Sequence, residues 1–196
     1  CGESTPSLYG CPNVAVTHRL VPVNVGSPTS MRGPGACPGL FALESALDEL
    51  AEKLKLDPIE LRLRNLSAND GAKNLPWSSS HFGDCLRLAS ERFGWKRRDP
   101  AIGSMREGRE IIGWGMASAT WPAHRQRASA RVALLSDGSA RVECGTQDIG
   151  TGTYTVLAQV VSELTGLPFQ RIAVAIGDSS LPRGPISGGS MATATV

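Results

Sequence analysis

The sequence has few aromatic residues, three histidines, little net charge and no long apolar run. Its 20 basic and 18 acidic residues nearly cancel, and no stripe of lysine or arginine alternates with aromatics, so nucleic-acid binding has no support. No segment approaches the roughly 18 apolar residues of a membrane span, and no charged stretch followed by an apolar stretch opens the chain. We therefore expect a globular protein whose function lies in a local site.

The residue types that usually hold metals or perform nucleophilic catalysis are scattered. The five cysteines lack the CxxC spacing of zinc and iron–sulfur sites, and we interpret them as free thiols. His18, His81 and His124 lie far apart, with no HExxH pair and no Ser/His/Asp spacing. Asp148 and Asp178 either form a carboxylate pair or, as loop aspartates commonly do, structure their own turns. The sequence thus predicts no metal ion held by side chains.

The first half of the chain is predicted to be mainly helical. Residues 1–38 contain six of the thirteen prolines and should be extended and rich in loops. From Leu40 to Leu54, leucines recur at steps of three and four, while acidic residues, Glu44 among them, occupy the other side of an amphipathic helix. Asp57 and Pro58 then fit the N-cap and first position of a second helix. Residues 81–93 form a third helix, residues 95–110 a linker, and a boundary follows near residue 110.

The second half is predicted to alternate strands with one helix. Residues 130–135 and 140–144 flank Asp137-Gly138, a dipeptide suited to a hairpin turn. Apolar residues at helical spacing from Val156 end at Gly166, and residues 171–176 form another strand. The order strand, strand, helix, strand indicates an α+β fold with helices packed on a mixed or antiparallel sheet.

Three loops have the composition of ligand-binding segments. In residues 30–35, glycines on both sides of Pro34 permit close approach of the backbone, and Arg32 offers a permanent positive charge, although such a loop is also typical of a solvated arginine. Residues 145–153 lead from a strand into a helix, so free N–H groups and the hydroxyls of Thr151 and Thr153 are suited to a phosphate, or else the loop is a simple glycine-rich turn. Residues 187–190 (Ser187, Gly188, Gly189, Ser190) form a third such loop, or a flexible turn.

Taken in order, these segments resemble the molybdenum hydroxylases, the xanthine dehydrogenase and aldehyde oxidase family, in the large molybdopterin-binding subunit. The resemblance rests on residues 31–35, 41–51, 57–65, 148–153 and 187–190, and residues 76–79 with 93–95 look most like the bacterial aldehyde-oxidising branch. It implies two incomplete portions of molybdopterin-binding domains. Residues 1–110 would be the C-terminal part of the first domain plus a linker, and residues 111–196 the N-terminal part of the second.

The resemblance also implies the chemistry. Molybdenum would be held by the dithiolene of the pterin, either alone or as the cytosine dinucleotide, with no metal ligand from the protein. Arg32 would stabilise negative charge on the substrate oxygen, and the cofactor would be bound by Arg32, Gly33, Gly150, Thr151, Gly152, Thr153, Ser187, Gly188, Gly189 and Ser190. Many relatives have glutamine where Thr151 stands. The family hydroxylates aldehydes or N-heterocycles with water as the oxygen donor and passes electrons to iron–sulfur clusters and FAD, which are expected on other subunits or segments.

Two further expectations follow. The catalytic base of the family, a glutamate, would lie after the last residue of this chain, so we interpret the chain as an internal piece that is inactive alone. We expect a cytoplasmic location, with the periplasm as the alternative. The competing functional hypothesis is a noncatalytic module in which the glycine loops bind an anion or a partner for assembly.

Overall fold

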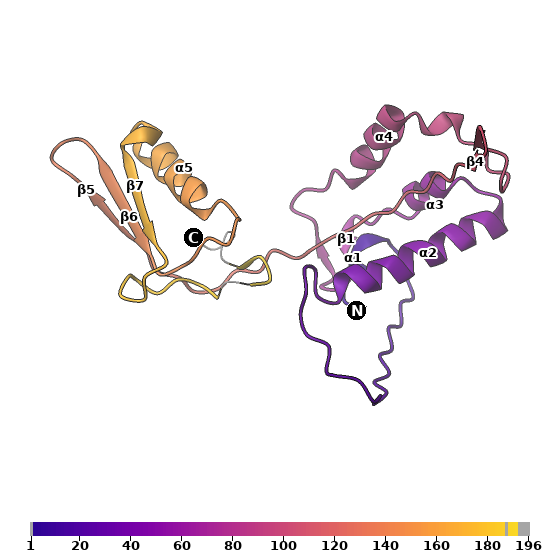
Figure 1. Cartoon of the computed structure of the whole chain (residues 1–196), viewed down its shortest axis with the longest axis horizontal. Helices are drawn as coiled ribbons and strands as arrows, with labels where there is room; N and C mark the ends of the chain where they lie inside the picture. Colours follow the sequence, from indigo (N-terminus) through magenta and orange to yellow (C-terminus); the bar gives the residue numbers. More distant parts are fainter. Residues whose placement is uncertain (1, 187, 192–196) are drawn as a thin grey trace. The chain divides into compact units, whose positions relative to one another are not determined.

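The computed structural model describes residues 2–186 and 188–191 and divides into two compact units. Unit 1 comprises Cys1–Trp121 and unit 2 comprises Pro122–Val196. Figure 1 shows that the regular structure of unit 1 is mainly helical, with long loops between the helices, whereas unit 2 is a small sheet with one long helix. The α+β class predicted from the sequence is confirmed.

The helices of unit 1 begin and end where local sequence dictates. Its elements are α1 (Thr5–Leu8), α2 (Ala36–Leu54), α3 (Pro58–Arg64), β1 (Asn69–Asp70), β2 (Leu75–Pro76), α4 (Phe82–Phe93), η1 (Trp95–Arg97), β3 (Arg106–Glu107) and β4 (Glu110–Ile111). The helix α2 ends at Lys55, which is left-handed with φ 53°. Asp57 then caps α3 by accepting hydrogen bonds from the backbone N–H groups of Ile59 and Glu60, and Pro58 occupies the first helical position, as predicted.

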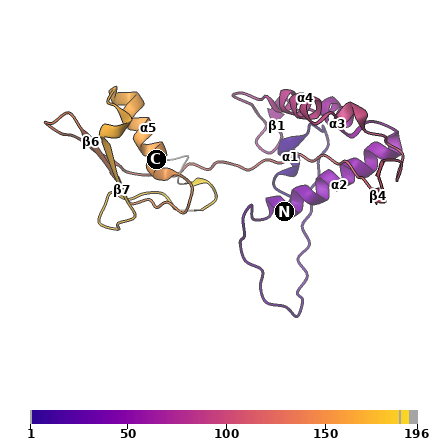
Figure 2. The same ribbon diagram turned by 45° about the horizontal axis from the view of Figure 1, so that its top comes forward.

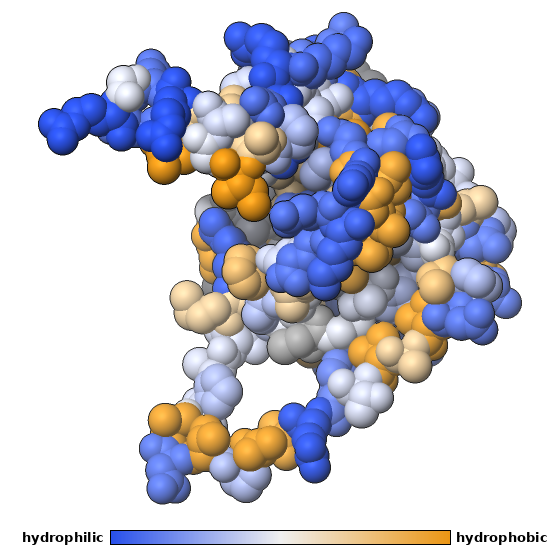
Figure 3. All heavy atoms as spheres, turned by 90° about the vertical axis from the view of Figure 1, so that its right-hand side faces the viewer, coloured by the Kyte–Doolittle hydropathy of each residue, from blue (hydrophilic) through white to orange (hydrophobic). Residues whose placement is uncertain are grey.

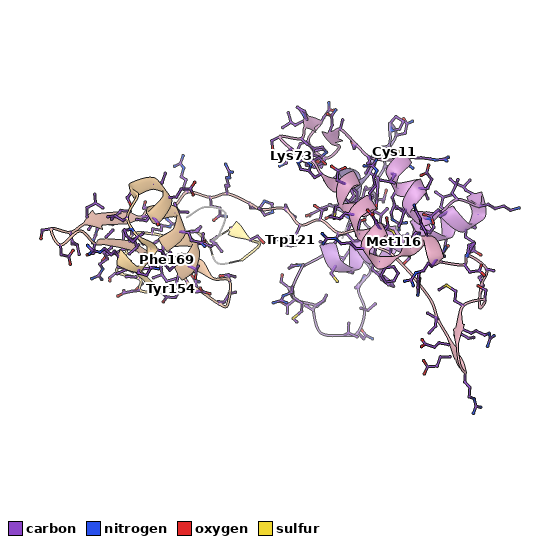
Figure 4. The ribbon with its side chains drawn as sticks, turned by 90° about the horizontal axis from the view of Figure 1, so that it is seen from above. Cys11, Lys73, Met116, Trp121, Tyr154 and Phe169 are labelled. Carbon is purple, nitrogen blue, oxygen red and sulfur yellow. The ribbon has the colours of Figure 1, made fainter. Side chains whose placement is uncertain are left out.

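The core of unit 1 shows that the segment expected to be a linker is structural. Ile59, Leu86 and Trp95 form the buried cluster, and Trp114 and Met116 pack against it. Figure 4 labels Met116 among the helices of unit 1. The indole N–H of Trp95 also donates to the cap residue, at 2.8 Å from Asp57 Oδ2. The linker prediction for residues 95–110 was therefore wrong, because it weighed the charged residues there above the single buried tryptophan.

The division between the units lies after the expected boundary near residue 110. Residues 111–121 belong to unit 1 by their contacts, since Trp114 and Met116 complete its core and the backbone N–H of Ser118 donates to Glu44. The assignment of residues 1–110 and 111–196 to two family domains stays a prediction.

A buried ion pair joins the separate segments of unit 1. Arg62 is fully buried, and its Nε lies 2.9 Å from Glu44 Oε2. Glu44 also accepts hydrogen bonds from the Tyr9 hydroxyl at 2.7 Å and from the Ser118 N–H at 2.7 Å. Arg62 further donates to the carbonyls of Pro58 and Glu44, and its Nη2 lies 2.9 Å from Asp48 Oδ1. The chain before α2, the helices α2 and α3, and the segment after β4 thus meet at one carboxylate.

Charge and burial change the pKa values of two members of this network. Burial alone would lower the pKa of Arg62, but the charge and hydrogen bond of Glu44, together with the nearby Asp48 and Tyr9, outweigh it and raise that pKa. Burial raises the pKa of Tyr9 from 10.0 to about 12, and its hydrogen bond to Glu44 adds to the effect. At neutral pH the network is therefore a charged pair with a neutral phenol.

The network corrects the prediction that Glu44 lies on the solvent side of α2. Glu44 is 3% exposed, whereas Leu50 and Leu54, on the predicted apolar face, are 43% and 52% exposed. The helical period located α2 correctly but did not indicate that a buried arginine would draw one carboxylate inward.

Unit 2 consists of a three-stranded sheet covered by one helix. Its elements are β5 (Arg131–Leu134), β6 (Ala140–Cys144), α5 (Thr153–Thr165), η2 (Phe169–Arg171) and β7 (Ile172–Ile176). The hairpin between β5 and β6 turns at Gly138, with φ 78°, and the helix ends at left-handed Gly166, both as predicted. Figure 2 shows α5 lying along the sheet, and Ala140, Val142 and Ile172 face Leu157, Ala158 and Val161 in a buried core.

The sheet is mixed because α5 is a crossover connection. The strands β5 and β6 are antiparallel, but β6 and β7 pair in parallel from Ala140 with Ile172 to Cys144 with Ile176. A helix between two strands permits parallel pairing, which a tight hairpin cannot. This βαβ unit places the loop after β6 and the start of α5 at the carboxyl end of the central strand.

None of the helices within the described residues combines the length and apolarity that crossing a membrane requires.

Substitution of Arg62 tests the importance of the buried pair. We expect Arg62→Ala to lower the free energy of unfolding of unit 1 by about 3–5 kcal/mol, because it leaves a buried Glu44 without its counter-ion. The matched control is Arg64→Ala, since Arg64 forms an exposed pair with Glu60 and should cost about 0.5 kcal/mol or less. Urea unfolding followed by tryptophan fluorescence reports on unit 1 alone, because all four tryptophans lie in it. Equal losses in the two variants would contradict the role assigned to the pair.

Candidate functional site

The Arg32 loop presents its guanidinium to solvent at the start of α2. Gly33 and Gly35 have φ values of 69° and 73°, which suit glycine and explain their places around Pro34. The N–H of Cys37 donates to the Gly33 carbonyl at 3.0 Å, and the N–H of Gly39 donates to Gly35 at 3.1 Å, so the loop continues directly into the helix. Arg32 is exposed and has no partner among the described residues. Its charge is available to an anionic group.

The loop between β6 and α5 is organised by Asp148. A single oxygen, Oδ1, accepts hydrogen bonds from the backbone N–H groups of Gly150 at 2.7 Å, Thr151 at 2.9 Å and Gly152 at 3.3 Å. These hydrogen bonds, led by the one from Gly150, lower the pKa of the Asp148 carboxyl. The prediction that these N–H groups are free for a phosphate was therefore wrong, since a carboxylate of the chain already occupies them.

The two threonines of this loop differ in what they offer a ligand. Thr153 begins α5 and is fully buried, whereas Thr151 is exposed. Their hydroxyl oxygens lie 2.9 Å apart. Gly150 and Gly152 have positive φ values of 98° and 77°, and a Cβ at either position would meet no atom within 4 Å. The loop thus exposes bare backbone and the Thr151 hydroxyl, with Thr153 supporting it from within.

Residues 177–184 form a second segment that packs against the start of this loop. The N–H of Gly145 donates to the Pro182 carbonyl, and the N–H of Gly177 donates to the Thr146 carbonyl at 2.7 Å. Gly184 lies so close that a Cβ there would be 2.5 Å from the backbone nitrogen of Thr146. Thr146 is fully buried, and its hydroxyl has no partner among the described residues. Glycine at position 184 is therefore required by close contact, which the sequence pattern did not reveal.

The third loop is described in part. Ser187 lies outside the described residues, whereas the N–H of Met191 donates to the Gly188 carbonyl at 3.0 Å and closes a turn through Gly189 and Ser190. Gly189 has φ 58° and Ser190 φ 60°, and a Cβ at Gly188 would meet nothing within 4 Å. This turn again presents open backbone and one hydroxyl.

The aspartates singled out in the sequence structure their own turns. Asp178 accepts hydrogen bonds from the N–H and hydroxyl of Ser180, at 2.8 Å and 2.7 Å, as Asp148 does from its loop. In the described part of the chain no three His, Cys, Asp or Glu side chains gather as a metal site would require. The groups on offer are backbone, hydroxyls and one arginine, which suit an organic anion better than a bare metal ion.

The structure places the predicted site residues in both units. Arg32 and Gly33 belong to unit 1, and the described residues among positions 150–153 and 188–190 belong to unit 2. The Arg32 loop precedes α2, and residues 150–153 lead into α5. Residues 188–190 follow the segment that packs on Gly145.

Comparison with known families identifies the group to which these loops belong. Residues 1–66 and residues 88–196 each match a model described as a molybdopterin cofactor-binding domain. The second match alone covers more than half of the chain. The chain belongs to the molybdopterin cofactor-binding domain family. The resemblance to the molybdenum hydroxylases is thereby confirmed.

Relatives of the molybdopterin-binding chain are molybdenum-binding subunits. It is 40% identical over 188 residues to the aldehyde oxidoreductase molybdenum-binding subunit PaoC of Escherichia coli K12, covering 95% of the chain and 26% of that subunit. It is 33% identical over 180 residues to the xanthine dehydrogenase molybdenum-binding subunit of Escherichia coli O157:H7, covering 88% of the chain and 24% of the relative. The chain thus spans about a quarter of the length of these relatives.

Solved structures agree in fold. The chain is similar to the aldehyde oxidoreductase of Desulfovibrio desulfuricans, with a TM-score of 0.58, 24% identity, and coverage of 83% of the chain and 18% of that protein. It is also similar to a Cu,Mo-CO dehydrogenase, with a TM-score of 0.58 and 20% identity over 83% of the chain and 24% of that protein. These likenesses establish the α+β arrangement of the molybdopterin-binding chain.

Acid titration tests the role of Asp148. Because folding lowers the pKa of Asp148, its contribution to stability is full above the ordinary value of about 3.9 and is lost as the pH falls through the lower folded value. We expect the NMR shifts of the Gly150 and Thr151 amides to titrate with a midpoint below about 3.9.

The control is Asp148→Asn, which keeps a side-chain oxygen as acceptor but cannot titrate. In this variant the acid transition of the two amides should disappear. A midpoint at or above the ordinary value, or a transition that survives the substitution, would show that Asp148 does not hold the loop.

Proposed function

We propose that the chain forms part of the molybdopterin-binding subunit of an oxidoreductase that hydroxylates aldehydes or N-heterocycles with water as the oxygen donor. The proposal rests on two family matches that follow each other in the chain, over residues 1–66 and 88–196. The chain is also 40% identical to the molybdenum-binding subunit of an aldehyde oxidoreductase. Identity to the xanthine dehydrogenase subunit is lower, at 33%, which favours an aldehyde as substrate.

The residues present fit a bulky organic cofactor. Gly150, Gly152 and Gly188 leave space that a side chain would fill, so a flat ring system can approach the backbone. We propose that these loops, with Thr151 and Ser190, hold the cofactor, while Gly33 lets Arg32 reach it. Thr153 contributes through its bond to Thr151. When bound, the molybdopterin cofactor supplies the redox chemistry of molybdenum.

Arg32 is the residue of this chain to which we assign a catalytic part. Its guanidinium is exposed and unpaired among the described residues, and the loop that carries it leads into the first turn of a long helix. A permanent cation so placed stabilises negative charge that develops on a substrate oxygen, and it does so without reorganising. We therefore propose that this chain binds the cofactor and stabilises charge.

Electron transfer requires partners. No cysteine cluster for an iron–sulfur centre lies among the described residues, where Cys11, Cys37 and Cys85 are exposed and Cys144 is buried. We propose that iron–sulfur and flavin groups reside on other subunits or segments. The rival hypothesis, a noncatalytic binding module, has no observation that favours it.

Cofactor analysis of the complete subunit tests the proposal. A matured preparation should contain molybdenum and an oxidised pterin with its characteristic fluorescence, in near-stoichiometric amounts. Absence of both from a matured, folded sample would overturn the cofactor assignment and leave the noncatalytic module.

Arg32→Ala in the complete enzyme tests the catalytic role. We expect turnover to fall roughly a hundredfold, as when one preorganised charge-stabilising donor is removed, while the molybdenum and pterin contents stay near the wild-type level. The control is Arg109→Ala, because Arg109 is an exposed arginine in the turn between β3 and β4. Unchanged turnover of Arg32→Ala would remove Arg32 from the mechanism.

A further inference from the structure

A long segment of unit 1 has almost no internal support. Residues 11–32, here called the arm, connect Gly10 to the start of the α2 loop without a helix or a strand. Within the described residues, the one backbone–backbone hydrogen bond of the arm joins the Val25 N–H to the Val23 carbonyl. Ordered loops of this length without secondary structure are uncommon in compact domains unless something binds them.

The arm exposes apolar side chains that a stable surface would cover. Leu20 is 97% exposed, and Met31 is 79% exposed. The valines of the arm, Val14, Val16, Val21, Val23 and Val25, are between 45% and 71% exposed. Figure 3 shows apolar atoms at the tip of the arm and an opening between its two limbs, so the limbs do not pack on each other. Contiguous apolar exposure of this kind marks an interaction surface.

The composition of the arm is that of an edge strand. Residues 14–23 are rich in β-branched residues, and Pro22 interrupts them once. In an extended strand, the N–H and C=O groups of successive residues point to opposite edges. Pro22 has no N–H, so the edge that it shares with Leu20 lacks a donor, whereas the edge of Arg19, Val21 and Val23 is complete. One edge of the arm is therefore fit for pairing.

The relatives are much longer than this chain, and the additional part of such a subunit is the partner that we infer for the arm. The arm lies inside the matched residues 1–66, so it is part of a family domain rather than a connection between domains. The chain covers only 26% of the aldehyde oxidoreductase subunit that it resembles, and three quarters of such a subunit is available to cover the arm. A sheet edge within the same polypeptide meets the arm without the entropy cost of association between two molecules.

We propose that the arm adds, as an edge strand, to a β-sheet formed by another part of the same subunit, and that it pairs through the edge of Arg19, Val21 and Val23. The sheet supplies main-chain partners for that edge and an apolar face for the exposed valines. The arm leads directly into Arg32, so this pairing also fixes the chain on the side of the Arg32 loop that α2 does not hold. The inference rests on the proposed function only in taking the chain as part of a longer subunit.

Amide hydrogen exchange measures the pairing. Peptides covering residues 14–25 are compared in the complete subunit and in the 196-residue chain. We expect exchange in the complete subunit to be at least about tenfold slower, as for paired strand amides. Equally fast exchange in both would overturn the proposal. Slow exchange of the isolated chain that depends on concentration, with a dimer in sedimentation, would also overturn it, because a second copy would then be the partner.

Two proline variants of the complete subunit identify the edge. Val23→Pro removes a donor from the complete edge and should accelerate exchange of the neighbouring amides, whereas Asn24→Pro removes one from the interrupted edge and should not. Equal effects would overturn the assignment of the edge. The wild-type comparison stands even where Val23→Pro prevents folding. Slow exchange of the arm in a subunit without molybdenum or pterin would support the pairing while contradicting the proposed function, so the two can fail separately.

Discussion

The buried pair of Glu44 and Arg62 is the interaction on which unit 1 depends. A carboxylate and a guanidinium out of water are costly unless each finds charge and hydrogen-bond partners, and here both do. The partners come from the chain before α2, from α2, from α3 and from the segment after β4. One set of polar contacts thus joins four pieces of chain. The helix α2 fixed in this way carries the Arg32 loop at its first turn.

In unit 2 a turn aspartate, rather than a buried ion pair, positions the candidate binding loop. A βαβ unit brings the end of β6 and the start of α5 together, and Asp148 accepts hydrogen bonds from the backbone N–H groups of residues 150–152, just before α5. The loop is thereby ordered before any ligand arrives. The loop exposes glycine backbone and one threonine hydroxyl. A further anionic group bound there would be repelled by the negative charge of Asp148. In unit 1 an ion pair fixes the helix that follows the Arg32 loop, whereas in unit 2 a carboxylate accepts backbone hydrogen bonds within its own loop.

Local signals in the sequence predicted much of this fold. Asp57 with Pro58, Asp137 with Gly138, and Gly166 specify a helix start, a hairpin and a helix end through interactions between near neighbours. What the sequence did not reveal depends on distant contacts. Glu44 was assigned to the solvent face because its partner lies 18 residues away in the chain. Trp95 was assigned to a linker because its charged neighbours outweighed it. Asp148 was expected to structure its own turn, but the N–H groups that it occupies were expected to be free for a phosphate. The three loops could be predicted because glycines next to an arginine or to hydroxyl residues are adjacent in the sequence. The contacts that order these loops could not be predicted in the same way.

Cofactor contact at the Arg32 loop and at residues 150–153 and 188–190 is tested most directly by the structure of the complete, cofactor-loaded subunit. We expect each of these loops to lie within hydrogen-bond or van der Waals distance of the cofactor, with no protein side chain bound to molybdenum. A cofactor that contacts neither glycine loop, or loops that face solvent in the loaded subunit, would contradict this expectation.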